Sequence, residues 1–444
     1  MEQPPNMLWA EGRTWDDLPD DLLAKILLSE FIGVKTLCKL RCVCKQWRNL
    51  LSDPLFQSLH YELSKKHPML LVLDTYTFDD RDIIYFTNLD LDDGQEDPTA
   101  GNNEIMTIST GISHIDGRLR MLSSSSVARG LVCLANSHRY FLCNPSLKEL
   151  ITLPEPTVGR LYVDGGGFGF IDTRNEYIVI HLIAPKPSGP SPIIGCEILR
   201  ISATVSAAGA GDTNNVNSSS SGILLGGSWE KIGSKCPYQI DAVDLEGWGI
   251  FVDGIFYWRV ETEDGNDIRI LSFNLDEERF EDVPRPPARG LLNGILDDYC
   301  RFPSLVELKG NLCLVDPYAA TIEPTSMVDI WVLTKDKYQE TTTTSSWIKE
   351  LSIPLPGFDY QFHDIDVVGD VDGDGSLLIY TTWHPMENGL TWQPNVWRYS
   401  PQHNEFRKLK SLKSFDIPGG EAPLFCLHTD SFFSVRNRRD TDSD

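Results

Sequence analysis

Apolar residues near the start of the chain recur at three- and four-residue intervals, which predicts helices there. Leu22 and Ile26, together with Leu23 and Leu27, mark two adjacent apolar rows on one short helix. A proline and two acidic residues precede these rows, as is favourable at the start of a helix. Gly33 interrupts the pattern, and a second helical stripe then contains Leu37, Leu40, Cys44, Trp47 and Leu51.

The helical pattern is expected to end at Asp53-Pro54, because the residue before a proline avoids the α region. Residues 59–68 predict one more helix and a hinge. From Met69 to about Val435 the apolar period changes to two, in short segments that are rich in β-branched and aromatic residues. Gly, Pro, Asn or Asp bounds each segment. This part of the chain is therefore predicted to be all β.

Similar units follow one another through the β region, such as RYFLCNPSLKELITLPEP, ILSFNLDEERFEDVPRPP and VWRYSPQHNEFRKLK. Each contains an apolar strand, a turn and a charged strand. Six approximate units predict radial repetition in a six-bladed β-propeller, and two stacked sandwiches are the alternative within the all-β class. The predicted fold is an α+β multidomain chain, with a small all-α module at 14–58 and an all-β propeller-like domain at 68–435. Residues 202–227 indicate a flexible insertion, and residues 436–444 a disordered tail.

Composition narrows the class of protein. The chain is 41% hydrophobic, with no apolar run long enough for a membrane span and no signal-peptide pattern, so we expect a soluble protein of the cytoplasm or nucleus. Its ten cysteines include no C-x-x-C pair and no zinc spacing. The formal net charge of −25 lies almost entirely outside residues 14–66, which hold eight basic and seven acidic residues. Such a surface argues against nucleic-acid binding and would suit a basic protein partner or serve solubility.

Two short motifs suggest chemistry but are better explained as structure. The glycine run Gly165–Gly169 precedes a hairpin, whereas a dinucleotide site needs a following helix, so close sheet packing is favoured. The acidic segment Asp370–Gly375 begins like a calcium loop, but Thr381 stands where the closing glutamate should be. Neither a metal nor a cofactor is predicted. The sequence contains no nucleophile elbow and no histidine pair that would indicate catalysis. Aromatic residues at the ends of predicted strands could line a recognition face or belong to the core.

The helical stretch from Trp15 to Phe56 resembles the F-box motif. The matching residues are Leu18, Pro19, Leu22, Ile26, Leu27, Leu37, Leu40, Arg41, Val43, Cys44, Lys45, Trp47, Arg48, Asp53, Pro54 and Phe56, with Leu37 one step from the usual register. A cap packed on its own domain is the alternative. A segment of about forty residues is too short to bury a stable core alone, so a partner surface is expected.

The β region resembles the F-box-associated domain of plant F-box proteins, through GLVCLAN, FLCNPSLKELITLP, GFGFIDTRNEYIVIHL and VDGIFYWRV. The resemblance implies a non-catalytic substrate receptor of an SCF-type ubiquitin ligase. Such a receptor binds a Skp-type adaptor, and through it a cullin scaffold, and presents its propeller to a target protein. The implied adaptor-binding residues are Leu18, Pro19, Leu22, Leu23, Ile26, Leu27, Leu40, Val43, Cys44, Trp47, Leu50 and Pro54. The alternatives are a β-propeller enzyme with a helical cap and a scaffold that acts outside ubiquitination.

Overall fold

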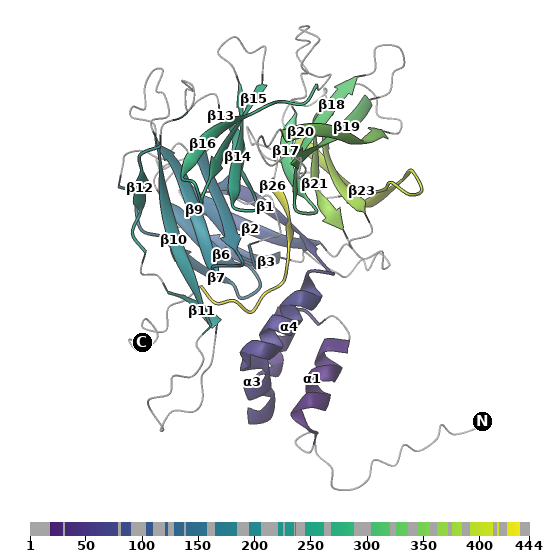
Figure 1. Cartoon of the computed structure of the whole chain (residues 1–444). Helices are drawn as coiled ribbons and strands as arrows, with labels where there is room; N and C mark the ends of the chain where they lie inside the picture. Colours follow the sequence, from purple (N-terminus) through teal and green to yellow (C-terminus); the bar gives the residue numbers. More distant parts are fainter. Residues whose placement is uncertain are drawn as a thin grey trace, which may run out of the picture.

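In the described part of the chain, four helices precede a ring of β-sheets (Figure 1). The computed structural model describes residues 18–29, 32–78, 81–89, 104–109, 120–122, 128–136, 139–157, 165–183, 195–205, 221–224, 227–234, 236, 245–261, 268–287, 303–319, 326–335, 345–355, 362–371, 375–383, 391–411, 415–416 and 424–435. Within these ranges no helix is long and apolar enough to cross a membrane.

The helices form a small module whose bounds differ in part from the prediction. They are α1 (Asp20–Ser29), α2 (Val34–Leu40), α3 (Lys45–Ser52) and α4 (Pro54–Ser64). The second predicted stripe is two helices, because the chain turns at residues 41–43 and Cys44 is extended. Asp53 ends α3 as predicted, but it also begins α4: its side chain accepts a hydrogen bond from the Leu55 N–H at 2.7 Å, and Pro54 takes the first helical position. The helix expected at 59–68 therefore starts five residues earlier.

Six antiparallel units of four or five strands, which we call blades 1 to 6, account for the strands in the described part of the chain. Blade 1 contains β26 (Leu424–His428), β1 (Met69–Phe78), β2 (Arg81–Leu89) and β3 (Glu104–Ser109). Blade 2 contains β4 (Arg120–Met121), β5 (Val132–Ala135), β6 (Tyr140–Asn144) and β7 (Glu149–Thr152). Blade 3 contains β8 (Gly166–Ile171), β9 (Glu176–Ile183), β10 (Gly195–Val205), β11 (Ser221–Leu224) and β12 (Glu230–Ile232).

The remaining blades repeat the same meander. Blade 4 contains β13 (Leu245–Val252), β14 (Ile255–Glu261), β15 (Ile268–Asn274) and β16 (Arg279–Val283). Blade 5 contains β17 (Ser304–Leu308), β18 (Asn311–Ala319), β19 (Ser326–Lys335) and β20 (Ser345–Pro354). Blade 6 contains β21 (Phe362–Val371), β22 (Ser376–Trp383), β23 (Thr391–Ser400), β24 (Glu405–Ser411) and β25 (Phe415–Asp416). The predicted propeller-like arrangement is confirmed, and blades 3 and 4 are joined in one nine-stranded sheet.

The ring closes where the first and last strands of the β region meet. β26 pairs antiparallel with β1, with Met69 opposite His428, so strands far apart in sequence complete blade 1. Closure of this kind leaves few free sheet edges. Part of the predicted insertion at 202–227 is also ordered strand, because Ser202 pairs with Leu224 and Val205 with Ser221. Residues 206–220 of that insertion and the predicted tail lie outside the described residues.

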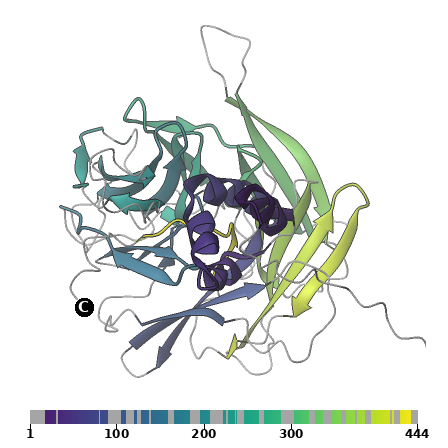
Figure 2. The same ribbon diagram turned by 90° about the horizontal axis from the view of Figure 1, so that it is seen from below.

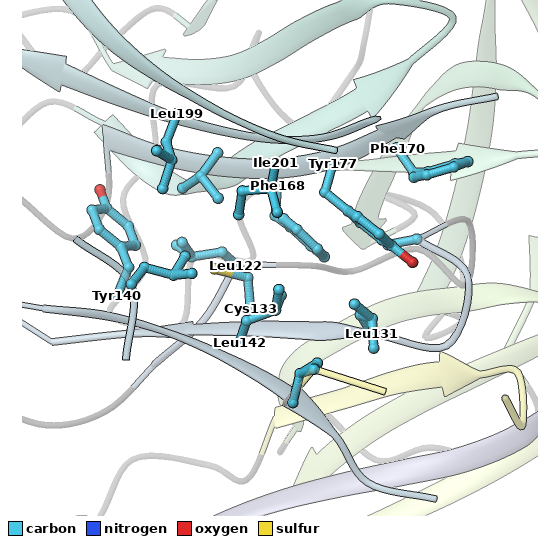
Figure 3. Packing of buried hydrophobic residues seen from close by; sticks show 14 of the residues in the cluster. Leu122, Leu131, Cys133, Tyr140, Leu142, Phe168, Phe170, Tyr177, Leu199 and Ile201 are labelled. Carbon is cyan, nitrogen blue, oxygen red and sulfur yellow. The ribbon is translucent and has the colours of Figure 1, made fainter. Parts of the chain in front are cut away.

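Apolar side chains fill the spaces between neighbouring blades. Between blades 2 and 3, Cys133, Tyr140 and Leu142 face Phe168 and Tyr177 (Figure 3), and all five are buried. Each blade is apolar on both faces because each is covered by the next, which explains the near-continuous hydrophobic runs in strands such as EYIVIHLI.

The helical module lies under the centre of the ring. Figure 2, seen from below, shows the helical module against the middle of the propeller. Their shared core contains Leu23, Leu27, Val34, Leu37, Leu51 and Phe56, and it also includes Phe432, which follows β26. The module and the propeller thus have a common apolar core.

Candidate functional site

Exposed apolar residues gather on the helical module. Among the described residues, six large hydrophobic side chains are exposed, and five of them are in the module: Leu22, Ile26, Val43, Leu55 and Leu59. The sixth, Ile348, lies on β20. Scattered apolar residues on a surface need no explanation, but a concentration on one small element marks an interaction site.

The sequence-predicted adaptor residues divide into three groups. Pro19, Leu22, Ile26 and Val43 are exposed; Ile26 is 51% exposed and Val43 59%. The half-buried residues are Leu18, Leu40, Cys44, Trp47, Leu50 and Pro54. Leu23 and Leu27 are only 1% and 3% exposed, because they point from α1 into the core that contains Phe432. In this structure these two residues support the surface from beneath and offer a partner almost no area. Their role in adaptor binding stays a prediction.

Leu55 and Leu59 on α4 were missed by the sequence analysis. They are 68% and 50% exposed, and their i,i+4 spacing places them on one face of the helix. The expectation that the helical run ends at Asp53-Pro54 hid this signal, because α4 was taken to begin only after Leu55.

Hydrogen bonds between the helices fix the relative positions of the surface residues. The Gln46 side chain donates to the Leu18 carbonyl at 2.6 Å and to Asp20 at 2.9 Å, which ties the start of α3 to the start of α1. Arg41 donates to Ser52 at 2.8 Å, which joins the turn before α3 to its end. The module therefore presents its apolar side chains from a fixed frame.

The three clustered cysteines contribute no evident chemistry. Cys38, Cys42 and Cys44 are free thiols. Burial is the main cause that raises the pKa of Cys38, so this thiol stays protonated and is a weak nucleophile. No group of residues suited to hold a metal ion is present in the described ranges.

The glycine run packs sheets closely, as the sequence favoured. A Cβ on Gly169 would lie 2.3 Å from the Phe251 ring, and one on Gly167 would lie 2.7 Å from Phe256. Gly167 also pairs in parallel with Gly249, which joins blades 3 and 4 into one sheet. The acidic segment is described only in part, since residues 372–374 lie outside the described ranges.

A buried polar pair between blades 2 and 3 is part of the core. The Tyr140 hydroxyl lies 3.2 Å from His181 Nδ1, and Trp229 packs against both rings. Burial lowers the pKa of His181 to about 4, so the imidazole is neutral at physiological pH. Neither ring is exposed to solvent, so a substrate could not reach this pair as it would a catalytic acid and base.

Comparison with known proteins agrees with the helical and β-sheet organisation. An F-box-like family model matches residues 15–62, and the model of the F-box associated beta propeller domain matches residues 95–411. The chain belongs to the F-box proteins with an associated β-propeller. Its F-box is the α1–α4 module, and the exposed apolar residues described above belong to it.

Plant relatives match over most of this F-box protein. It is 23% identical to the F-box/LRR-repeat protein At2g40920 of Arabidopsis thaliana, over 92% of this chain and 85% of that one. It is 22% identical to the putative F-box protein At1g70960 of the same plant, over 91% and 93% of the two chains. Among solved structures, TolB from Acinetobacter baumannii is similar at a TM-score of 0.38 and 8% identity, over 86% and 72% of the chains, which is too low to carry an argument.

Proposed function

We propose that this F-box protein is a substrate receptor of an SCF-type ubiquitin ligase, which binds a Skp-type adaptor through its helices and a target protein through its propeller. The observation that carries the proposal is the concentration of exposed apolar side chains on the F-box module. Burial of Leu22, Ile26 and Val43 against a groove would supply most of the affinity. The adaptor would in turn connect the receptor to a cullin scaffold.

The charge distribution supports an acidic partner for the module. Residues 35–48 contain five basic residues and no acidic residue, whereas the whole chain has a net charge of −25. Lys35, Lys39, Lys45 and Arg48 are exposed around α2 and α3. Complementary charge at the rim of an interface raises the association rate and disfavours wrong partners, so adaptor association should slow as salt increases.

The receptor would have no chemistry of its own. Its contribution is to hold a target near the ubiquitin-charged enzyme, which raises the effective concentration of the reacting groups. The acidic propeller would suit a target with a basic recognition surface. Action in the cytoplasm or nucleus is part of the proposal.

The test uses the full-length chain and a purified Skp-type adaptor. In the double variant Leu22→Asp/Val43→Asp, two exposed residues become charged and the core residues stay intact, so we expect adaptor binding to fall at least about a hundredfold. Ile348→Asp is the matched control, because Ile348 is equally exposed but lies on the propeller, and it should bind normally. The proposal fails if the wild-type chain binds no Skp-type adaptor, or if the control loses binding as much as the double variant.

A further inference from the structure

Residues 429–435, which we call the joint segment, run between the helical module and the propeller. Figure 1 shows the chain after β26, in yellow, passing between the helices and the strands of blade 2. Residues 429–433 are all buried, although this segment forms no regular sheet. Its side chains alternate between the two parts: Asp430 and Phe432 contact the helices, and Phe433 and Val435 contact the propeller.

Phe432 completes the apolar core of the helices. It packs in one cluster with Leu27 and Leu37. Its ring lies 5.3 Å from the His60 ring and 6.5 Å from the Phe56 ring, both edge-to-face. His60 is held in place, because its Nε2 lies 2.8 Å from the Ile32 carbonyl oxygen. A residue of the β region therefore occupies the centre of the helical module.

Asp430 supplies the cap that α2 lacks in its own sequence. The residue before α2 is Gly33, which has no side chain that could accept a hydrogen bond from the first N–H groups. The Val34 N–H instead donates to Asp430 Oδ2 at 2.6 Å, across 396 residues of sequence. A Cβ at position 33 would lie 3.2 Å from the same oxygen, so a glycine gives the carboxylate room.

The other side of the joint segment is bonded to blade 2. The Asn144 side chain donates to the carbonyls of Ser431 at 3.1 Å and Phe433 at 2.7 Å. Glu149 accepts hydrogen bonds from the Ser434 hydroxyl at 2.8 Å and the Val435 N–H at 2.9 Å. These contacts hold the segment in one conformation on the propeller.

The covalent path closes a loop around this contact. The chain leaves α4 and enters β1 within five residues, and β1 pairs with β26. The joint segment directly follows β26 and contacts the helices again, through Asp430 at α2 and Phe432 at α4. Besides the covalent connection before β1, the contacts of Asp430 and Phe432 attach the module to the propeller, and Leu147 of blade 2 also packs against the module's core.

We propose that the joint segment holds the F-box in one fixed orientation on the propeller, so that adaptor and target sit at a set separation. The set separation of adaptor and target rests on the proposed receptor function, whereas the fixed orientation of the F-box does not. A fixed separation is the property that a ligase needs in order to present a target lysine to the ubiquitin-charged enzyme.

The experiment compares Phe432→Ala with Phe433→Ala in the full-length chain. Spin labels, introduced as unnatural amino acids at the exposed positions 49 on α3 and 405 on β24, report the distance between module and propeller. We expect a narrow distance distribution in the wild type, a broad one in Phe432→Ala, and a narrow one in Phe433→Ala. Phe433→Ala should instead lower the stability of the propeller, because Phe433 belongs to the core between blades 2 and 3.

A second variant covers the case in which Phe432→Ala unfolds the helices. Asp430→Ala removes the cap and leaves the apolar core of the helices intact, and amide hydrogen exchange at the start of α2 should become about tenfold faster while β5 and β6 exchange as before. The inference is overturned if Phe432→Ala leaves the distance distribution narrow, or if Asp430→Ala leaves exchange in α2 unchanged. Neither readout involves the adaptor, so a failure here is distinguishable from failure of the proposed function. If both hold, Phe432→Ala should keep adaptor binding while ubiquitin transfer to a bound target slows.

Discussion

Substitutions of the neighbouring residues Ile26 and Leu27 on α1 should have different effects, the first on adaptor affinity and the second on stability. Ile26 is 51% exposed, whereas Leu27 is 3% exposed and packs in the core with Phe432. Burying a whole Ile side chain contributes about 1.5–3 kcal/mol, so the exposed half of Ile26 offers a partner roughly 1 kcal/mol. Ile26→Ala should therefore raise the dissociation constant for a Skp-type adaptor about fivefold, with little change in stability.

Leu27→Ala should have the opposite effect. Loss of a buried leucine costs about 2–5 kcal/mol, because a cavity remains where the side chain was removed. Stability is measured by urea unfolding followed by far-UV circular dichroism, and affinity by titration calorimetry at a temperature where both variants are folded. Unchanged affinity in Ile26→Ala, or a larger loss of affinity in folded Leu27→Ala, would refute the assignment of α1 faces made from the structure.

Two further predictions concern the propeller, and one concerns charge. Gly169→Ala should destabilise the chain by about 1–3 kcal/mol in urea unfolding, because the new Cβ would overlap the Phe251 ring, whereas Gly233→Ala, with nothing within 4 Å, should be nearly neutral; equal effects would contradict the close-packing interpretation. Burial lowers the pKa of His181 to about 4, so the unfolded chain binds a proton near pH 6.5 and the folded chain does not. Stability should then fall by about 2 kcal/mol for this residue between pH 7 and pH 5, and His181→Asn should show a correspondingly shallower dependence. Added salt should lower the rate of adaptor association, and this decrease should be smaller in Lys39→Gln/Lys45→Gln than in the wild type. Stopped-flow mixing measures the rate. If the rate of both proteins depends equally on salt concentration, the basic residues do not form the rim of the interface.

The sequence was sufficient for the architecture because the relevant signals are local. A change of apolar period from helical spacing to alternation near Met69 separates the two parts, and the repeating strand-turn units indicate six blades. The glycine run before IDTRNEYIVIHL was interpreted correctly, since a following hairpin is a local feature.

The surface of the module was predicted less well, for a physical reason. Both rows of α1 are equally apolar in sequence, and only tertiary packing decides that Leu23 and Leu27 face inward while Leu22 and Ile26 face outward. One residue of the core that these leucines enter, Phe432, lies in a segment with no pattern of its own. The cap from Asp430 to Val34 likewise joins positions 396 residues apart, which no window of sequence can connect.

The contact between Asp430 and Val34 has a consequence for the order of protein synthesis. Val34 is translated 396 residues before the carboxylate that caps its helix, which corresponds to about 20–80 s at roughly 5–20 residues per second. During this interval the nascent F-box lacks Phe432 in its core, and blade 1 lacks β26. A truncated chain that stops before residue 424 would carry the apolar helices without either partner, so it should be recognised by chaperones as unfinished. Completion of blade 1 by β26 and completion of the F-box core by Phe432 thus wait for the same stretch of the chain, residues 424–435.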